Sequence, residues 1–221
     1  MKDGESREQV EIAVFSLIER GLAELDFPEA ADQVSELTRL VLLLSEWASR
    51  ISLTAHRDPI DMAGRLVLDA AALSKALPEL DGASRLADLG SGVGFPGLPI
   101  AILRPNLEVV LVESRLKRHH LQREARRQLR LQRVIPVLGR SDQVEPHLSD
   151  VVVAQAMTQP TRALELMRPW TRSGGLVALP ASDAAGRPTL PVGFEALSLR
   201  EYRVPVTGRA RKLWIARVER A

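Results

Sequence analysis

Apolar residues in the first third of the chain recur at intervals of three and four. This pattern covers residues 8–25 and 28–51 and is typical of amphipathic helices. A third helix is predicted to begin with Asp58 as its N-cap and Pro59 in its first turn, and to run to Pro78. The first third of the chain is therefore predicted to be helical.

After Ser84 the pattern changes to short apolar runs that are typical of buried parallel strands. We expect five such strands, at Arg85–Leu89, Leu107–Val112, Val134–Leu138, Asp150–Ala154 and Leu176–Leu179. Helical patterns separate several of them, at Gly97–Leu103, Arg115–Leu131 and Pro160–Arg168. Two further runs, Phe194–Val204 and Lys212–Val218, predict an antiparallel pair that closes the sheet.

This order of elements predicts an α/β fold with a doubly wound, mostly parallel, seven-stranded sheet. The turn-forming segment Pro78–Ser84 marks a boundary between the two kinds of pattern. We therefore expect two parts, an N-terminal helical extension over residues 1–80 and a sheet domain over residues 81–221.

Composition narrows the class of protein. The chain is 45% hydrophobic and 26% charged, as in an ordinary globular protein, and it contains no cysteine. Disulfides, thiolate metal sites and a cysteine nucleophile are thereby excluded. The apolar runs are shorter than the roughly 20 residues that a bilayer crossing needs, and residues 1–10 do not resemble a secretory signal. We expect a cytoplasmic protein with no membrane association.

Charge is distributed unevenly along the chain. Residues 1–50 carry eleven acids against five Lys and Arg, whereas residues 114–133 carry eight Lys and Arg against a single acid, Glu124. A second basic cluster follows near the C-terminus, at Arg203, Arg209, Arg211, Lys212, Arg217 and Arg220. Such clusters suit a polyphosphate backbone, although an arginine-rich helix face in water explains the first of them equally well.

Glycines recur where the first predicted strand leads into a helix. The run Asp88-Leu-Gly-Ser-Gly-Val-Gly-Phe-Pro-Gly97 combines the backbone freedom of glycine with room for a close ligand. The dinucleotide fingerprint needs a glycine where Phe95 stands, so a nicotinamide or flavin enzyme fits poorly. The run instead resembles the D-x-G-x-G-x-G loop of S-adenosylmethionine-dependent methyltransferases. Its candidate cofactor-binding residues are Asp88, Gly90, Ser91, Gly92, Gly94 and Phe95.

Acidic residues follow the second and third predicted strands. Glu113 stands 23 residues after Gly90, where a carboxylate can accept both hydroxyls of a ribose. Asp142, after the third strand, is placed to face an adenine amino group. The alternatives are that each acid caps the helix after it and that the glycine turn holds no ligand.

Five motifs resemble those of one family. Trp47-Ala-Ser-Arg-Ile-Ser-Leu-Thr54 is similar to W-N-x-x-x-N-L-T, and Arg65-Leu-Val-Leu-Asp69 to R-H-x-L-D-S. Residues 88–97 resemble D-x-G-T/S-G-x-G-x-P-G, and residues 113–118 resemble D/E-S-x-x-K-R. Gly139-Arg140 is similar to the S/G-R that follows the third strand. Together the motifs resemble the RsmG (GidB) family of small-subunit (16S) ribosomal RNA guanine-N7 methyltransferases.

This resemblance implies a Rossmann-like class I methyltransferase with S-adenosylmethionine as its cofactor and a guanine N7 as its target. Gly90, Phe95, Ser141 and Asp142 would line the cofactor site. The implied substrate-binding residues are Lys117, Arg118, Arg140 and Gln155. The implied partner is small-subunit ribosomal RNA or the assembled small subunit, and we expect a monomer.

The chain departs from the family pattern at three positions. Leu66 replaces the histidine of R-H-x-L-D-S, Gln155 replaces the arginine of S-R-A, and Pro180 replaces a lysine after the fifth strand. Gln155 keeps hydrogen bonding but loses a charge that can bind a carboxylate or a phosphate. Two alternatives therefore stay open, a non-catalytic ribosome-binding or assembly protein and a methyltransferase with a different substrate.

The expected reaction depends on positioning. Guanine N7 offers a lone pair and carries no proton, so its methylation needs no general base, and no catalytic residue is assigned. We expect no metal site, because the spacing of the four histidines does not fit one. These histidines, which we expect on the surface or in contact with RNA, are His56, His119, His120 and His147. Arg65 and Asp69 form either a local ion pair or part of a helix that borders the cofactor cleft.

Overall fold

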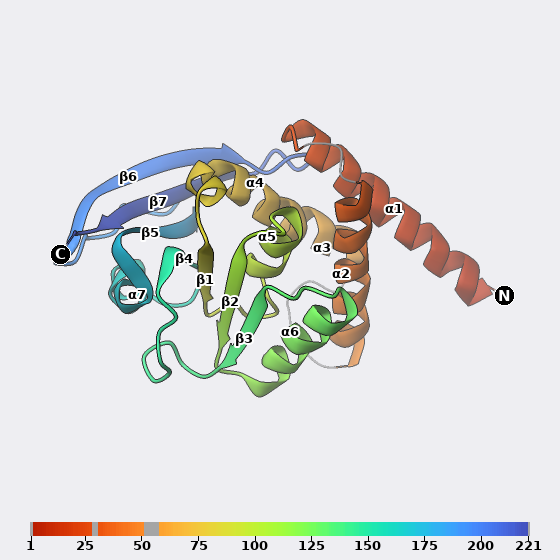
Figure 1. The fold of residues 1–221 in the computed structure, drawn as a ribbon. Helices are drawn as coiled ribbons and strands as arrows, with labels where there is room; N and C mark the ends of the chain where they lie inside the picture. Colours follow the sequence, from red (N-terminus) through yellow and green to blue (C-terminus); the bar gives the residue numbers. More distant parts are fainter. Residues whose placement is uncertain (1, 28–30, 51–57, 221) are drawn as a thin grey trace.

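The computed structural model describes residues 2–27, 31–50 and 58–220. Its strands are β1 (Arg85–Leu89), β2 (Glu108–Glu113), β3 (Val134–Leu138), β4 (Ser149–Ala154), β5 (Thr171–Ser182), β6 (Phe194–Arg203) and β7 (Ala210–Val218). They form one seven-stranded sheet in the order β3-β2-β1-β4-β5-β7-β6 (Figure 1). The first five strands are parallel, and β7 runs antiparallel between β5 and β6. The predicted mostly parallel sheet with a closing antiparallel pair is confirmed.

Most helices begin and end close to the predicted limits, whereas the first begins at Lys2 instead of residue 8. They are α1 (Lys2–Glu24), α2 (Ala31–Arg50), α3 (Pro59–Met62), α4 (Leu68–Ala76), α5 (Gly97–Leu103), α6 (Leu116–Gln128) and α7 (Pro160–Met167). Asp58 is the N-cap of α3, since its Oδ1 accepts the backbone N–H of Asp61 at 2.9 Å. The predicted helix from residue 58 to 78 is nevertheless divided, because a π-helical turn, η1 (Ala63–Val67), separates α3 from α4.

Helices cover the two faces of the sheet unequally. Side chains alternate between the faces along a strand, so that Leu86 faces one core and its neighbour Ala87 the other. The first core contains buried side chains of α1, α2, α4, α5 and α6, whereas α7 and the short helix η3 (Arg168–Trp170) supply the helical part of the second. In Figure 1, α7 lies on the opposite side of the sheet from α5 and α6. The helices before β1 therefore share one continuous core with the sheet.

Two connections at the carboxyl edge of the parallel strands contain no helix. Residues 139–148 join β3 to β4, and residues 183–193 join β5 to β6, as turns and extended chain. The carboxyl edge of a doubly wound sheet is where ligands bind, and here its rim consists of loops. The sheet topology therefore directs attention to the loops after β1, β3, β4 and β5.

Some sequence-based expectations are wrong in detail. His119 is buried at 8% exposure, not on the surface, because it lies on the face of α6 that packs against the sheet. Arg211 is also buried, at 6% exposure, so the basic residues near the C-terminus do not form one exposed cluster. The second half of the motif that begins at Trp47 falls on residues 51–54, which lie outside the described residues. Within the described residues, no helix is both long and apolar enough to cross a membrane.

Candidate active site

The glycine-rich turn lies directly at the carboxyl end of β1. Gly90, Gly92 and Gly94 have φ values of +68°, +58° and +99°, a backbone region that residues other than glycine rarely adopt. A Cβ atom on Gly90 would lie 2.8 Å from Met157 Cγ, and one on Gly94 would lie 2.3 Å from Leu98 Cδ1. Glycine is therefore required at both positions, for backbone conformation and for space.

Asp88 lies underneath this turn. Its side chain is fully buried, and its Oδ2 accepts the backbone N–H of Gly97 at 2.9 Å, which ties β1 to the start of α5. The pKa of Asp88 is raised to about 7, because burial and, to a smaller extent, the charge of Glu113 raise it by more than the hydrogen bond from Gly97 lowers it. The structure thus places Asp88 as a support beneath the loop.

Gln122 was missed by the sequence analysis. It is fully buried on α6, and its Nε2 donates to Ser91 Oγ at 2.9 Å and to the carbonyl of Gly92 at 2.7 Å. The Ser91 N–H donates in turn to the carbonyl of Val112 at 3.0 Å. These bonds fasten the glycine turn to β2 and α6. The available signal was a polar residue between Leu121 and Ala125, on the apolar face of a helix that is otherwise basic.

Glu113 lies at the end of β2 and is 5% exposed. Its Oε1 accepts the backbone N–H of Arg115 at 2.7 Å, whereas the N-cap of α6 is Arg115 itself, so Glu113 does not cap this helix. Its Oε2 lies 3.9 Å from Arg118 Nη1. Arg118 is half-buried beside the glycine turn, whereas Lys117 is exposed at the first turn of α6.

A first cavity of about 310 Å³ opens beside the glycine turn. It brings together four residues that the sequence analysis selected, Gly90, Arg140, Ser141 and Asp142. Asp142 accepts two hydrogen bonds from Arg140, each of 3.0 Å, and this bonding lowers the pKa of the Asp142 carboxyl. The Ser141 carbonyl accepts the indole N–H of Trp170 at 3.0 Å, which anchors this loop to the second core.

A second cavity of about 330 Å³ adjoins the first, since Met157 and Thr158 line both. It lies over the carboxyl ends of β4 and β5, and its lining includes Gln155 and Pro180, two of the departures from the family pattern. The third, Leu66, lies elsewhere and packs partly buried against the first core. Among the described residues that line the second cavity, the single cation is Arg211.

Arg211 belongs to a buried polar cluster that no local pattern indicates. Its Nη2 lies 2.8 Å from Asp69 Oδ2, and Asp69 also accepts the hydroxyl of Tyr202 at 3.2 Å. Burial and the Asp69 charge raise the pKa of Tyr202. A local ion pair between Arg65 and Asp69 is therefore absent: Asp69 faces the interior and binds Arg211, whereas Arg65 is exposed and pairs with Asp61.

The remaining candidates lie around these cavities without lining them. Phe95 is partly buried against the first core, and a Cβ on Gly92 would lie 3.9 Å from Arg118 Nη1. The described part of the chain contains no group of three or more histidine, aspartate or glutamate side chains that could hold a metal ion. His56 lies outside that part.

Comparison with known proteins assigns the family. A family model described as rRNA small subunit methyltransferase G matches residues 33–185, more than half of the chain. The chain belongs to this family. The ribosomal RNA small subunit methyltransferase G of Chromohalobacter salexigens is 35% identical over 92% of this chain and 96% of its own length. The protein of the same name from Xanthomonas oryzae pv. oryzae is 33% identical over 92% and 95%.

Solved structures agree on the fold. A SAM-dependent methyltransferase from Aquifex aeolicus superposes with a TM-score of 0.53 over 72% of this chain and 93% of that one, at 14% sequence identity. At this identity the likeness concerns the fold alone. The class I methyltransferase fold of this member of the methyltransferase G family is therefore established by its own sheet order and by this neighbour.

Proposed function

We propose that this protein transfers the methyl group of S-adenosylmethionine to N7 of a guanine in small-subunit (16S) ribosomal RNA. Membership of the methyltransferase G family supports the reaction class and the RNA. The observation that carries the proposal is the pair of adjoining cavities, one beside the glycine turn and one over β4 and β5. Their shared wall is where a methyl group would pass from cofactor to base.

The residues of the first cavity fit an adenosyl cofactor. Gly90 brings the bare backbone of the turn to the cavity wall beside Met157, and Ser141 and Asp142 line the same cavity. Glu113 Oε2 keeps lone pairs for ribose hydroxyls, because Oε1 accepts the bond at the start of α6. The cofactor supplies an electrophilic methyl group on a sulfonium. The protein's task is to hold that group and to exclude water.

The second cavity suits a base turned out of its stack. Enzymes that modify a base bring it out of the RNA helix and bind it in a pocket, with contacts to its edges. Gln155 supplies an amide for such contacts, and Arg211 supplies a fixed positive charge. Lys117, Arg118 and Arg140 add positive charge on the side of the first cavity. Since N7 carries no proton, no residue has to remove one.

The decisive experiment compares small-subunit ribosomal RNA from the native host with and without this gene. Mass spectrometry is expected to find one 7-methylguanosine that disappears when the gene is removed and returns when it is restored. An unchanged set of methylated nucleotides, with the protein expressed and folded, would contradict the proposed target. Labelled S-adenosylmethionine with purified small subunits and with protein-free RNA then identifies the substrate form.

Replacement of Gly90 by alanine tests the cofactor cavity. The backbone at this position has a φ of +68°, and the added methyl group would lie 2.8 Å from Met157 Cγ, so the turn or Met157 must move into the cavity. Strain of this kind costs about 1–3 kcal/mol, which predicts roughly tenfold to hundredfold weaker cofactor binding. Isothermal titration with S-adenosylmethionine measures the change.

The matched control for this test is Gly82→Ala. Gly82 has a φ of −101°, and nothing lies within 4 Å of the added Cβ. Cofactor affinity is expected to be unchanged in this variant. If Gly90→Ala binds S-adenosylmethionine as tightly as Gly82→Ala does, the cavity beside Gly90 is not the cofactor site.

A further inference from the structure

The arginine-rich helix α6 connects two distant parts of the molecule. Its first turn lies beside Glu113 at the carboxyl edge of the sheet, and its last turn leads to the amino end of β3. With thirteen residues it is about 20 Å long. A positively charged surface at its far end is therefore separated from the site of methyl transfer by about the length of this helix.

Two neighbouring hollows lie along the outer face of α6 and around its far end. One, of about 630 Å³, lies between α2, the end of α5 and the turn after α6, and the other, of about 690 Å³, lies beside Trp47 and the outer face of α6. Residues 130–132 line both, so the hollows form one continuous trough, which we call the α2–α6 groove. Both elements that form its walls also contact each other, since Arg39 Nη2 donates to the Gln128 carbonyl at 3.3 Å.

The α2–α6 groove has an excess of positive charge. Its lining contains six arginines, Arg39, Arg123, Arg126, Arg127, Arg130 and Arg133, and two carboxylates, Glu36 and Glu124. Glu124 is bonded by Arg127. The pKa of Glu36 is raised, because the effect of burial is larger than that of the Arg39 charge, which lowers it. The Asp32 charge raises it slightly further. Within the described part of the chain, no carboxylate lies within ion-pair distance of Arg123, Arg126, Arg130 or Arg133.

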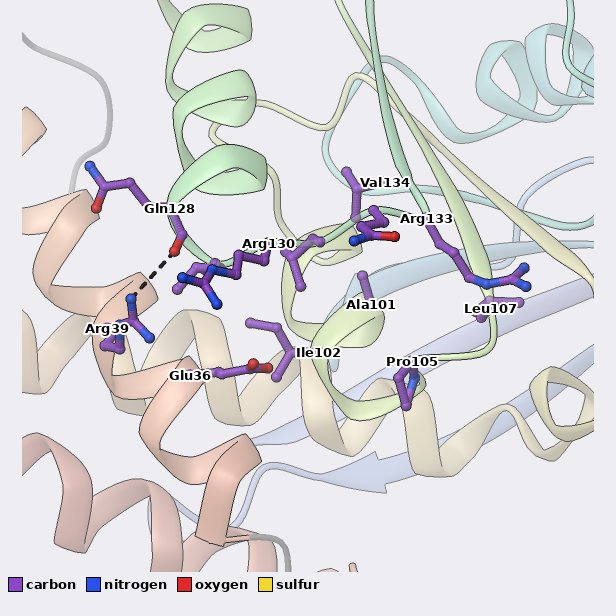
Figure 2. A pocket seen from close by; sticks show the side chains of 13 residues that line it. Glu36, Arg39, Ala101, Ile102, Pro105, Leu107, Gln128, Arg130, Arg133 and Val134 are labelled. Carbon is purple, nitrogen blue, oxygen red and sulfur yellow. Dashed lines mark hydrogen bonds between the residues drawn. The ribbon is translucent and has the colours of Figure 1, made fainter.

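Two arginines of the groove lie on different elements and approach each other. Figure 2 shows Arg39, on α2, and Arg130, in the turn after α6, pointing toward one another across the groove, with Glu36 on the same helix as Arg39. Guanidinium groups that face each other repel, and a phosphate between them removes this repulsion and accepts hydrogen bonds from both. The half-buried Trp47 adds an aromatic surface at the other end of the groove. Base stacking on aromatic rings commonly accompanies phosphate contacts in RNA-binding proteins.

We propose that the α2–α6 groove is a second RNA-binding surface, which holds the phosphate backbone of the substrate at a distance from the methylated guanine. The proposal rests on the RNA substrate proposed above and adds where that RNA is held. Several phosphates fit along the groove, because its lining runs from His120 on α6 to Val134 at the start of β3, and a nucleic acid strand carries a phosphate about every 3.4 Å of helix axis. The groove contributes affinity and orientation, and the methyl-transfer chemistry occurs beyond the first turn of α6, on the side of Glu113.

The test replaces three exposed arginines of the groove in one variant, R123Q/R126Q/R133Q. Arg39 is left in place because it joins α2 to α6, and Arg130 because its backbone has a φ of +54°. The matched control, R168Q/R172Q/R220Q, removes the same charge from exposed positions in η3, at the start of β5 and after β7, and the strands β2, β1 and β4 separate this part of the sheet from β3. Full-length proteins are titrated with protein-free small-subunit ribosomal RNA and with small subunits at several salt concentrations.

The groove variant is expected to bind RNA about tenfold more weakly at physiological salt, and the slope of log affinity against log salt is expected to fall by about 2. KM for RNA rises while kcat and the affinity for S-adenosylmethionine stay at wild-type values. The control keeps both the slope and KM. If the two variants behave alike while the wild-type protein methylates its RNA, the groove proposal is wrong and the proposed function stands.

A different partner would give a different pattern. If the groove variant binds protein-free RNA normally and loses affinity only for assembled subunits, the groove contacts a ribosomal protein and the RNA proposal is wrong. If the wild-type protein does not methylate small-subunit RNA in any form, the proposed function itself fails. The two failures are therefore separate results of the same set of titrations.

Discussion

Between pH 4 and pH 8 the wild-type protein is expected to lose roughly 3–4 kcal/mol more of its unfolding free energy than the Asp88→Asn variant does. The reason is the carboxyl of Asp88, which has a pKa of about 7 in the folded protein and an ordinary value of 3.8. A carboxyl whose pKa is raised by folding contributes stability that is complete below pH 4. This contribution falls between about pH 4 and pH 7, because the carboxyl is ionised in the unfolded chain and still protonated in the folded protein, and it levels off once the buried group ionises.

Urea unfolding at intervals of half a pH unit measures this difference. The slopes of unfolding free energy against pH are compared, because the cost of burying the amide of the Asp88→Asn variant does not change with pH. The control is Asp150→Asn, because the hydrogen bonds from Ser84 and Arg85 and the charge of Arg172 lower the pKa of Asp150 in spite of its partial burial. That group titrates below pH 4, so the slope between pH 5 and pH 8 stays that of the wild type. Parallel curves for wild type and Asp88→Asn would show that Asp88 is ionised under the loop.

Replacing Asp69 by alanine is expected to destabilise the protein by about 3–5 kcal/mol, because it leaves a buried guanidinium without its counter-charge. The side chains of Arg211 and Asp69 are 7% and 9% exposed, and their closest atoms are 2.8 Å apart. Loss of Asp69 also removes the acceptor of the Tyr202 hydroxyl. The free energy of unfolding in urea gives the value directly.

Two further variants test whether this loss of stability comes from the buried ion pair. Glu165→Ala removes an exposed ion pair with Arg162 and is expected to change stability by less than about 1 kcal/mol. The double replacement Asp69→Leu and Arg211→Met removes both charges together and is expected to restore most of the stability. RNA methylation is still expected to be lost, because Arg211 lines the second cavity. An effect of Asp69→Ala no larger than that of Glu165→Ala would contradict a buried ion pair.

Local features of the sequence determined most of the elements and the family. The short apolar runs predict all seven strands, and α5 has the predicted limits, Gly97–Leu103. The glycines after β1 predict a tight turn, because glycine readily adopts positive φ values. The structure has positive φ values at these positions. The motifs identify the family, as the comparison confirms. The division into residues 1–80 and 81–221 stays a prediction, since the helices before β1 share a core with the sheet.

Contacts between distant residues were decided only by the tertiary structure. The pattern of α6 predicts a basic helix, but the burial of His119 and Gln122 depends on which face meets the sheet. Asp69 and Arg211 are 142 positions apart in the sequence, and β7 brings them together by inserting between β5 and β6. A periodic pattern reports which residues share a face of one element. It carries no information about which face of another element they meet, and the buried charges and the α2–α6 groove depend on that packing.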